Sequence, residues 1–228
     1  MKFSGFQRLG VWSRDLAVRV CGEACGSVRL GSRNRQAIYF LVMAFRPKKI
    51  LEIGTHVGAS TISMAAALKR LGEGSSITTV DIFDVNDRAN GPWRKIGLDG
   101  SPSDFAGSLN FHDRVNFVTA PAQDFMRSTD QSFDFIFLDG SHKSHDVYQE
   151  VSAALNLLNP GGTILLHDYF PAGESLCPDK EILQGPFRAM RRIHEENRAI
   201  GILPLGALPW ATKQGTNATT LALVLKDY

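Results

Sequence analysis

Short apolar runs recur along the chain and alternate with stretches whose apolar residues are spaced as on a helix. A parallel strand that is covered on both faces is a nearly continuous apolar run. The runs that predict such strands are Ile50–Ile53, Ser76–Asp81, Val115–Ala120, Phe133–Asp139 and Gly161–Asp168. Helical spacing marks residues 36–45, 61–71 and 144–158. The alternation predicts an α/β fold with a doubly wound, mostly parallel sheet.

A glycine-bearing turn follows the first predicted strand. Gly54 and Gly58 allow a tight turn and a close approach of the backbone to a ligand. The turn leads into a helix whose N-terminal amides would face that ligand. This arrangement predicts a nucleotide-cofactor site, and the alternative is a glycine turn that only ends a structural strand.

The spacing of the glycines distinguishes between cofactors. A dinucleotide fingerprint is Gly-x-Gly-x-x-Gly, whereas Gly54-x-x-x-Gly58 lacks the middle glycine and follows Glu52. A carboxylate at that position would repel a pyrophosphate, but it suits a cofactor with a positive amino group. The pattern therefore disfavours nicotinamide-dependent reduction. Asp81, at the end of the second predicted strand, is placed to bind the two ribose hydroxyls of an adenosine.

The segment Ile50–Thr61 resembles motif I of the class I S-adenosylmethionine-dependent methyltransferases. Later motifs are similar to the small-molecule O-methyltransferase-like branch, which includes sugar-modifying enzymes of antibiotic pathways, with catechol-type enzymes more distant. These motifs are Asp139-Gly-Ser-His142, Asn159-Pro-Gly-Gly162 and Leu165-Leu-His-Asp-Tyr169. The resemblance implies a seven-stranded Rossmann-like sheet of order 3-2-1-4-5-7-6. A helix near residues 186–198 and a hairpin near residues 200–205 and 219–225 would complete it.

The resemblance also implies S-adenosylmethionine as the cofactor. The glycine turn would hold its methionine part, and the segment after the third strand would contact adenine. The cofactor-binding residues predicted in this way are Glu52, Gly54, Thr55, His56, Gly58, Asp81, Ala122 and Gln123. For His56, a role of the backbone alone is an open alternative.

The predicted acceptor is a hydroxylated small molecule, which Asp139, His142 and Asp168 would address. Methyl transfer is an in-line displacement, so the protein must align the hydroxyl, remove its proton and exclude water. His142 is the predicted base, because imidazole can accept a proton near neutral pH. The alternative is a histidine that caps the following helix. His167 is a second candidate base, with a buried, hydrogen-bonded role as its alternative.

Asp139 and Asp168 are also predicted metal ligands. The implied strand order places their strands side by side, about 5 Å apart. In catechol-type relatives two acids and an Asn bind magnesium, but Tyr169 occupies the Asn position here. Mg²⁺ would then need another oxygen ligand or several waters, and roles as simple hydrogen-bond acceptors stay open. Strand alternation predicts that His167 points away from Asp168.

Composition predicts a single core with an N-terminal addition. The 228 residues are 43% apolar and 21% charged, with three cysteines that form no Cys-x-x-Cys pair. The cysteines favour a reducing, cytoplasmic location and disfavour a structural zinc site, and no apolar run is long enough to cross a membrane. We predict a basic helical segment at residues 1–45 packed on a methyltransferase domain at residues 46–228.

The charge of the chain is uneven. Residues 1–50 hold ten Lys or Arg and two acids, a net of +8, so the other 15 basic and 21 acidic residues sum to −6. Leu9, Trp12, Leu16 and Val20 predict a basic amphipathic helix. It could bind nucleic acid, an acidic partner or an anionic substrate, but a solvated face of a packed helix is favoured. A homodimer through N-terminal helices is a further expectation from the resemblance.

Three other functions are alternatives to O-methyl transfer. RNA or N-methylation is disfavoured, because the chain has neither an appended RNA-binding motif nor an Asn-Pro-Pro-Tyr-type tetrapeptide. A catalytically inactive S-adenosylmethionine-binding scaffold and a nicotinamide enzyme are the others. Substrate specificity is expected in residues 83–114, which hold Trp93 and could form a lid, and in residues 169–185.

Overall fold

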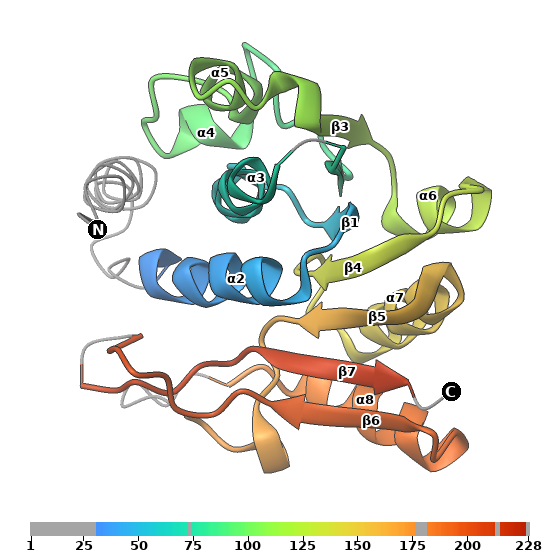
Figure 1. Ribbon diagram of the computed structural model, residues 1–228. Helices are drawn as coiled ribbons and strands as arrows, with labels where there is room; N and C mark the ends of the chain where they lie inside the picture. The colour runs from blue at the N-terminus through green and yellow to red at the C-terminus, as the bar shows by residue number, and fades with distance from the viewer. Residues whose placement is uncertain (1–30, 73, 177–181, 213–214, 227–228) are drawn as a thin grey trace, which may run out of the picture.

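A seven-stranded sheet forms the centre of the computed structural model, which describes residues 31–72, 74–176, 182–212 and 215–226 (Figure 1). Its strand order is β3-β2-β1-β4-β5-β7-β6, which confirms the predicted fold class. The strands are β1 (Lys49–Ile53), β2 (Ser76–Asp81), β3 (Val115–Thr119), β4 (Phe133–Leu138), β5 (Leu158–Leu166), β6 (Ile200–Pro204) and β7 (Ala222–Lys226).

The first five strands are parallel, and β7 runs antiparallel between β5 and β6. Strand β1 lies at the switch point, because it pairs with β2 on one side and β4 on the other. The chain turns outward in opposite directions from this point, so the carboxyl ends of β1 and β4 open a crevice. The apolar runs become strands because they are buried on both faces: Ile50, Leu51 and Ile136 have no exposed surface.

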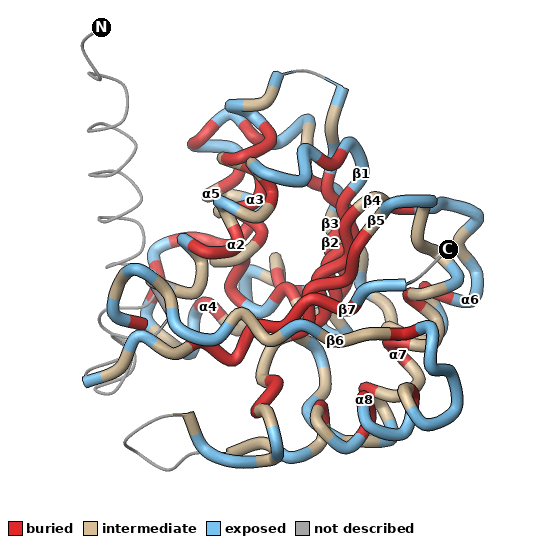
Figure 2. Tube along the Cα trace, turned by 60° about the horizontal axis from the view of Figure 1, so that its bottom comes forward, coloured by how far each residue is buried: buried red, intermediate tan, exposed pale blue. Residues whose placement is uncertain are grey.

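Helices cover both faces of the sheet. Helices α2, α3 and α5 pack on one face, and α6, α7 and α8 pack on the other (Figures 1 and 2). Buried residues follow the sheet and the inner helix faces, as Figure 2 shows. The helices are α2 (Gly31–Phe45), α3 (Ala59–Leu71), α4 (Pro92–Lys95), α5 (Pro102–Ser108), α6 (Ala122–Ser128), α7 (Ser144–Leu157) and α8 (Gln184–Glu196), with short 3₁₀ turns at His112–Arg114 and Pro171–Gly173.

The connection between β2 and β3 is folded rather than open. Trp93, Val57 and Leu98 form a small buried cluster there, beside the glycine turn. Ser101 and Asp104 cap α5 reciprocally, so this helix has a defined start. The connection therefore braces the turn that follows β1.

The described part of the N-terminal segment is α2, which packs on α3 through Ala37, Ile38 and Val42. The helix predicted from Leu9 to Val20 lies outside the described residues. Within the described ranges, no helix has the length and apolar character needed to cross a membrane.

Candidate active site

A cavity of about 1020 Å³ opens at the carboxyl ends of the parallel strands. The predicted site residues that line it share this sheet edge: Gly54, Thr55, His56, Asp81, Ala122, Gln123, Asp139, His142 and Asp168. Residues from α2, α7 and the segment between β6 and β7 complete its wall.

The glycine turn after β1 is tightly packed. Gly54 has a φ of +95°, and a Cβ there would lie 2.2 Å from the carbonyl oxygen of Asp139. Gly58 has a φ of +75°, and a Cβ there would lie 2.7 Å from Cβ of Pro102. Both positions need glycine for conformation and for space. The turn thus brings backbone from β1 against the end of β4.

Asp81 is fixed by backbone amides of two loops. Its Oδ2 accepts a hydrogen bond from the His56 amide at 2.8 Å, and its Oδ1 accepts one from the Phe83 amide at 3.1 Å. Each carboxylate oxygen can accept a second bond, so Asp81 can still receive two hydroxyls from the cavity. The backbone of His56, which has a φ of +48°, therefore positions Asp81.

Gln123 faces the cavity at the first turn of α6. Its Nε2 is buried and has no hydrogen-bond partner among the described residues. A buried donor of this kind is costly unless an acceptor arrives. A ring nitrogen of adenine has the required chemistry, so Gln123 and Asp81 together fit an adenosine group.

Glu52 does not lie where the sequence analysis expects it. Its carboxylate is fully buried, is absent from the cavity wall, and accepts hydrogen bonds from the hydroxyls of Ser60, Thr61 and Thr79. Burial raises the pKa of Glu52 to about 7 against the opposing effect of these hydroxyls. Glu52 thus joins β1 to α3 and β2, and the predicted contact with a positive amino group is not what this geometry provides.

Two acids and two histidines meet at the ends of β4 and β5. His167 Nδ1 lies 3.0 Å from Asp139 Oδ1 and 3.2 Å from Asp168 Oδ1. His142 Nδ1 lies 3.4 Å from Asp168 Oδ2. Asp168 therefore stands between the histidines. Helix α7 begins at Ser144 without a side-chain cap, so His142 is not the capping histidine of the alternative interpretation.

The prediction that His167 points away from Asp168 is wrong. Strand β5 ends at Leu166, and Asp168 has a φ of +53°. This left-handed conformation, which Asp tolerates better than most residues, breaks the alternation. His167 packs edge-on against Phe137, whereas Tyr169 takes the opposite side and packs against Phe187.

The charges in this cluster are strongly coupled. Burial by itself would lower the pKa of His167, but Asp139 and Asp168 outweigh it and raise that pKa well above its ordinary value. Burial would raise the pKa of Asp168, whereas His167 and His142 lower it overall. The cluster therefore favours an ionised Asp168 beside a protonated His167.

The loop that carries His142 is held from two helices. Ser141 Oγ donates to Asp146 Oδ2 of α7 at 2.8 Å, and Glu150 of the same helix accepts the Ser141 amide. Burial raises the pKa of Glu150 to about 7. A Cβ on Gly185 of α8 would lie 1.9 Å from the carbonyl oxygen of His142. These contacts fix the backbone around the candidate base.

The far wall of the cavity was not predicted from the sequence. Helix α2 and the β6–β7 connection supply Asn34, Arg35, Ile38, Thr212, Ala218 and Thr220. The Thr219 hydroxyl and Asn34 Oδ1, 3.0 Å apart, join the two segments. No local pattern marks these residues, because they come from opposite ends of the chain. Of the described residues in the two segments expected to set specificity, only Phe83 and Phe170 line the cavity.

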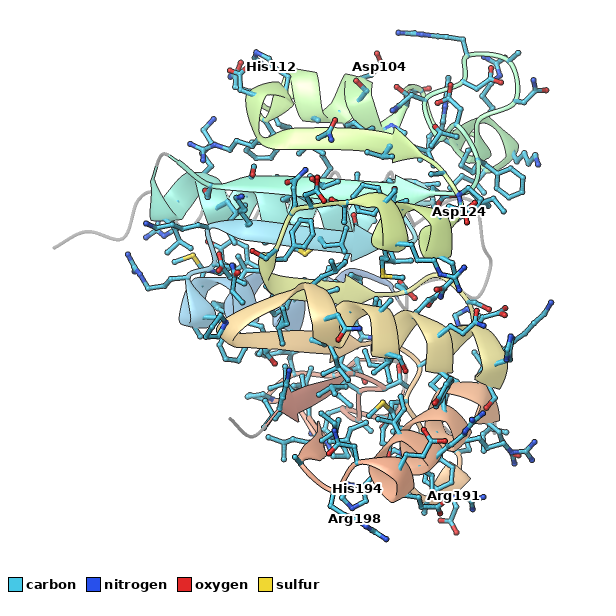
Figure 3. The ribbon with its side chains drawn as sticks, turned by 90° about the vertical axis from the view of Figure 1, so that its right-hand side faces the viewer. Asp104, His112, Asp124, Arg191, His194 and Arg198 are labelled. Carbon is cyan, nitrogen blue, oxygen red and sulfur yellow. The ribbon has the colours of Figure 1, made fainter. Side chains whose placement is uncertain are left out.

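His112 and His194 take no part in this site. Figure 3 shows them at opposite ends of the molecule. His112 lies 3.0 Å from Asp113 on the surface, and His194 Nδ1 contacts the Ile200 carbonyl at 2.8 Å.

The strand order and the cavity at the switch point define the Rossmann-like fold of class I methyltransferases. Solved structures with this fold include an O-methyltransferase from Bacillus cereus in complex with SAH, with a TM-score of 0.62 and 21% identity over 99% of this chain and 92% of that one. TomG from Streptomyces achromogenes, solved with SAM, has a TM-score of 0.61 and 18% identity over 100% and 92%.

A family model described as a methyltransferase domain matches residues 51–169, just over half of the chain. The chain belongs to this methyltransferase-domain family. A probable caffeoyl-CoA O-methyltransferase 3 from Dictyostelium discoideum is 26% identical over 68% of this chain and 59% of its own length. The O-methyltransferase hkm8 from Aspergillus hancockii is 24% identical over 55% and 44%. The chain spans less than two thirds of these curated relatives.

Proposed function

We propose that this protein transfers a methyl group from S-adenosylmethionine to a hydroxyl group of a small molecule. The observation that carries the proposal is one continuous cavity that holds both the adenosine-compatible residues and the His142–Asp168 pair. The names of the curated relatives and solved structures, which are O-methyltransferases, support the same chemistry.

The cofactor end of the cavity would be built by Gly54, Asp81, Ala122 and Gln123, which line it. Asp81 would accept the ribose hydroxyls, Gln123 would donate to adenine beside Ala122, and Gly54 would let the turn approach the methionine part. The predicted Gly58 is absent from the cavity wall and would only shape the turn. When bound, S-adenosylmethionine supplies an electrophilic methyl group on a sulfonium. The carboxylates of Asp81, Asp139 and Asp168 make the cavity suitable for this positive charge.

The acceptor end would activate the hydroxyl. His142 Nδ1 faces Asp168 Oδ2 at 3.4 Å, which leaves Nε2 free to take the acceptor proton. Asp168 would orient the imidazole and stabilise its protonated form. Asp139 and Asp168 would hold a divalent cation if one binds, and otherwise they would accept hydrogen bonds.

The first experiment is isothermal titration with S-adenosylhomocysteine, comparing wild type with Asp81→Ala and with Asp84→Ala, a nearby exposed acid outside the cavity wall. We expect the Asp81 variant to lose about 10–100-fold in affinity, because hydrogen bonds to a charged group are worth about 1.5–3 kcal/mol. The Asp84 variant should bind like wild type. No binding by folded, ligand-free wild type would refute the proposal.

Transfer itself is tested with labelled S-adenosylmethionine and a panel of hydroxylated compounds. His142→Gln should lower kcat by about 10²–10⁴-fold, whereas His145→Gln, an exposed histidine on α7, should have little effect. Binding of S-adenosylhomocysteine without any transfer would favour an inactive cofactor-binding scaffold.

A further inference from the structure

His167 places a nitrogen where catechol-type relatives would use oxygen ligands alone. We propose that Asp139, His167 and Asp168 form a mononuclear site for a divalent first-row transition ion such as Co²⁺, in preference to Mg²⁺. The inference deepens the proposed function, since it names the ion of the same site.

The three ligand atoms are already spaced as a metal requires. His167 Nδ1 and one oxygen from each carboxylate lie within 4.8 Å of one another. The nitrogen is 3.0 Å from the Asp139 oxygen and 3.2 Å from the Asp168 oxygen. Adjacent ligands of an octahedral ion with bonds of about 2.1 Å lie about 3.0 Å apart, so both distances from the nitrogen match the spacing of such ligands.

The nitrogen also faces both carboxylates. Nδ1 of His167 is buried and forms ion pairs with an oxygen of Asp139 at 3.0 Å and of Asp168 at 3.2 Å, but it has no aligned hydrogen-bond partner among the described residues. A metal ion bound to the two carboxylates and to this nitrogen would replace the proton that otherwise lies between them. Because the ring packs edge-on against Phe137, its orientation is supported from behind.

The ligand set decides which ion is favoured. Carboxylates and water suit Mg²⁺ and Mn²⁺, whereas imidazole suits Fe, Ni, Cu and Zn, and the affinity of a given site rises from Mn²⁺ through Co²⁺ towards Cu²⁺. Tyr169 cannot restore an oxygen ligand, because its ring is buried against Phe187. One nitrogen and two oxygens therefore favour a transition ion over Mg²⁺.

Outer contacts hold the Asp168 ligand in position. Thr220 Oγ1 lies 3.4 Å from Asp168 Oδ1, and His142 Nδ1 lies 3.4 Å from Asp168 Oδ2. Such contacts orient metal-binding carboxylates. The cluster also lines the cavity, so an ion there would keep positions open to water or an acceptor.

The test is metal binding by the full, chelator-treated chain, which needs no acceptor. CoCl₂, MnCl₂ and MgCl₂ are titrated separately by calorimetry, and bound Co²⁺ is followed by its visible absorption. We expect Co²⁺ to bind at least about tenfold more tightly than Mg²⁺ and more tightly than Mn²⁺. Pulsed electron paramagnetic resonance of bound Mn²⁺ should show coupling to a ¹⁴N nucleus.

His167→Asn should lower Co²⁺ affinity by about tenfold or more and remove the ¹⁴N coupling, whereas His145→Asn should change neither. Asp139→Asn provides a second variant, which should also weaken the site, and circular dichroism checks that each variant is folded. Three results would overturn the inference: wild type binds Mg²⁺ as tightly as Co²⁺, folded His167→Asn binds Co²⁺ as tightly as wild type does, or wild type binds no ion.

Titration of the same samples with S-adenosylhomocysteine distinguishes failure of the metal site from failure of the proposed function. Cofactor binding without an ion refutes only the metal site, and ion binding without cofactor refutes only the proposed function.

Discussion

Glu52 is a carboxyl group enclosed by three hydroxyls inside the sheet, and its chemistry is that of a structural residue. The hydroxyls of Ser60, Thr61 and Thr79 converge on it from α3 and β2. An acid with no exposed surface pays for ionisation in lost hydration, which three neutral donors only partly replace. This explains why the pKa of Glu52 rises from 4.5 to about 7.

The raised pKa of Glu52 predicts a pH-dependent stability. The folded state binds the proton more tightly than the unfolded state, so Glu52 stabilises the fold most below about pH 4.5 and this contribution is lost as pH rises through about 7. Glu52→Gln has no ionisation to lose. Urea denaturation at pH 5 and pH 8 should show the free energy of unfolding of the variant rising relative to wild type by up to about 3 kcal/mol.

The exposed Glu174→Gln is the matched control for this measurement. Its difference from wild type should be the same at both pH values. If Glu52→Gln also showed no change between pH 5 and pH 8, Glu52 would be ionised in the folded protein throughout this range.

At the scale of elements, the apolar runs predicted the strands well, because a strand that is buried on both faces is itself a short continuous apolar run in the sequence. Strands β1 and β2 match the predicted runs within a residue at each end, and α7 begins at the predicted Ser144. Asp81, Asp139 and Asp168 were predicted from the same runs, because each acid lies at or just after the end of a strand. The direction of His167 was not, because it depends on the single left-handed residue Asp168.

Contacts between distant elements carry no such local signal. The far wall of the cavity joins α2 to the β6–β7 connection through Asn34 and Thr219, which are 185 residues apart. Likewise, nothing near Gly185 indicates that α8 packs against the loop carrying His142. Such contacts follow from the whole fold and become visible only with it.

The packing of α8 predicts an effect of Gly185→Ala on catalysis. The added Cβ would lie 1.9 Å from the His142 carbonyl oxygen and 2.9 Å from the Ser144 nitrogen, both backbone atoms. The loop must therefore shift, and His142 with it. We expect kcat to fall by about tenfold to a hundredfold, since small misplacements of a reacting group are costly, while the affinity for S-adenosylhomocysteine stays near wild type.

Gly107→Ala serves as the control for Gly185→Ala, because a Cβ at that helical position meets nothing within 4 Å. It should leave kcat unchanged. Wild-type kcat in folded Gly185→Ala would mean that the loop moves freely or that His142 does not act on the acceptor.

At the scale of the whole molecule, the cavity connects the two halves of the sheet. Its wall takes residues from β1 and β2 in one half of the sheet. In the other half it takes residues from β4, from the segment that follows β5 and from the C-terminal hairpin segment. A ligand that contacts both halves binds the folded chain and not the unfolded one. Binding must then raise the stability of the entire fold.

This linkage gives a prediction for thermal unfolding. S-adenosylhomocysteine at about 100 times its Kd should add about 2.7 kcal/mol, which for a chain of this length raises Tm by roughly 5–10 °C. At the same ligand concentration, an Asp81→Ala variant weakened 10–100-fold should lose about 1.3–2.3 kcal/mol of that gain. Differential scanning calorimetry measures both shifts, and Asp84→Ala should behave as wild type. An undiminished shift in Asp81→Ala would place the cofactor away from β2, because a ligand can stabilise the fold only through the contacts it makes there.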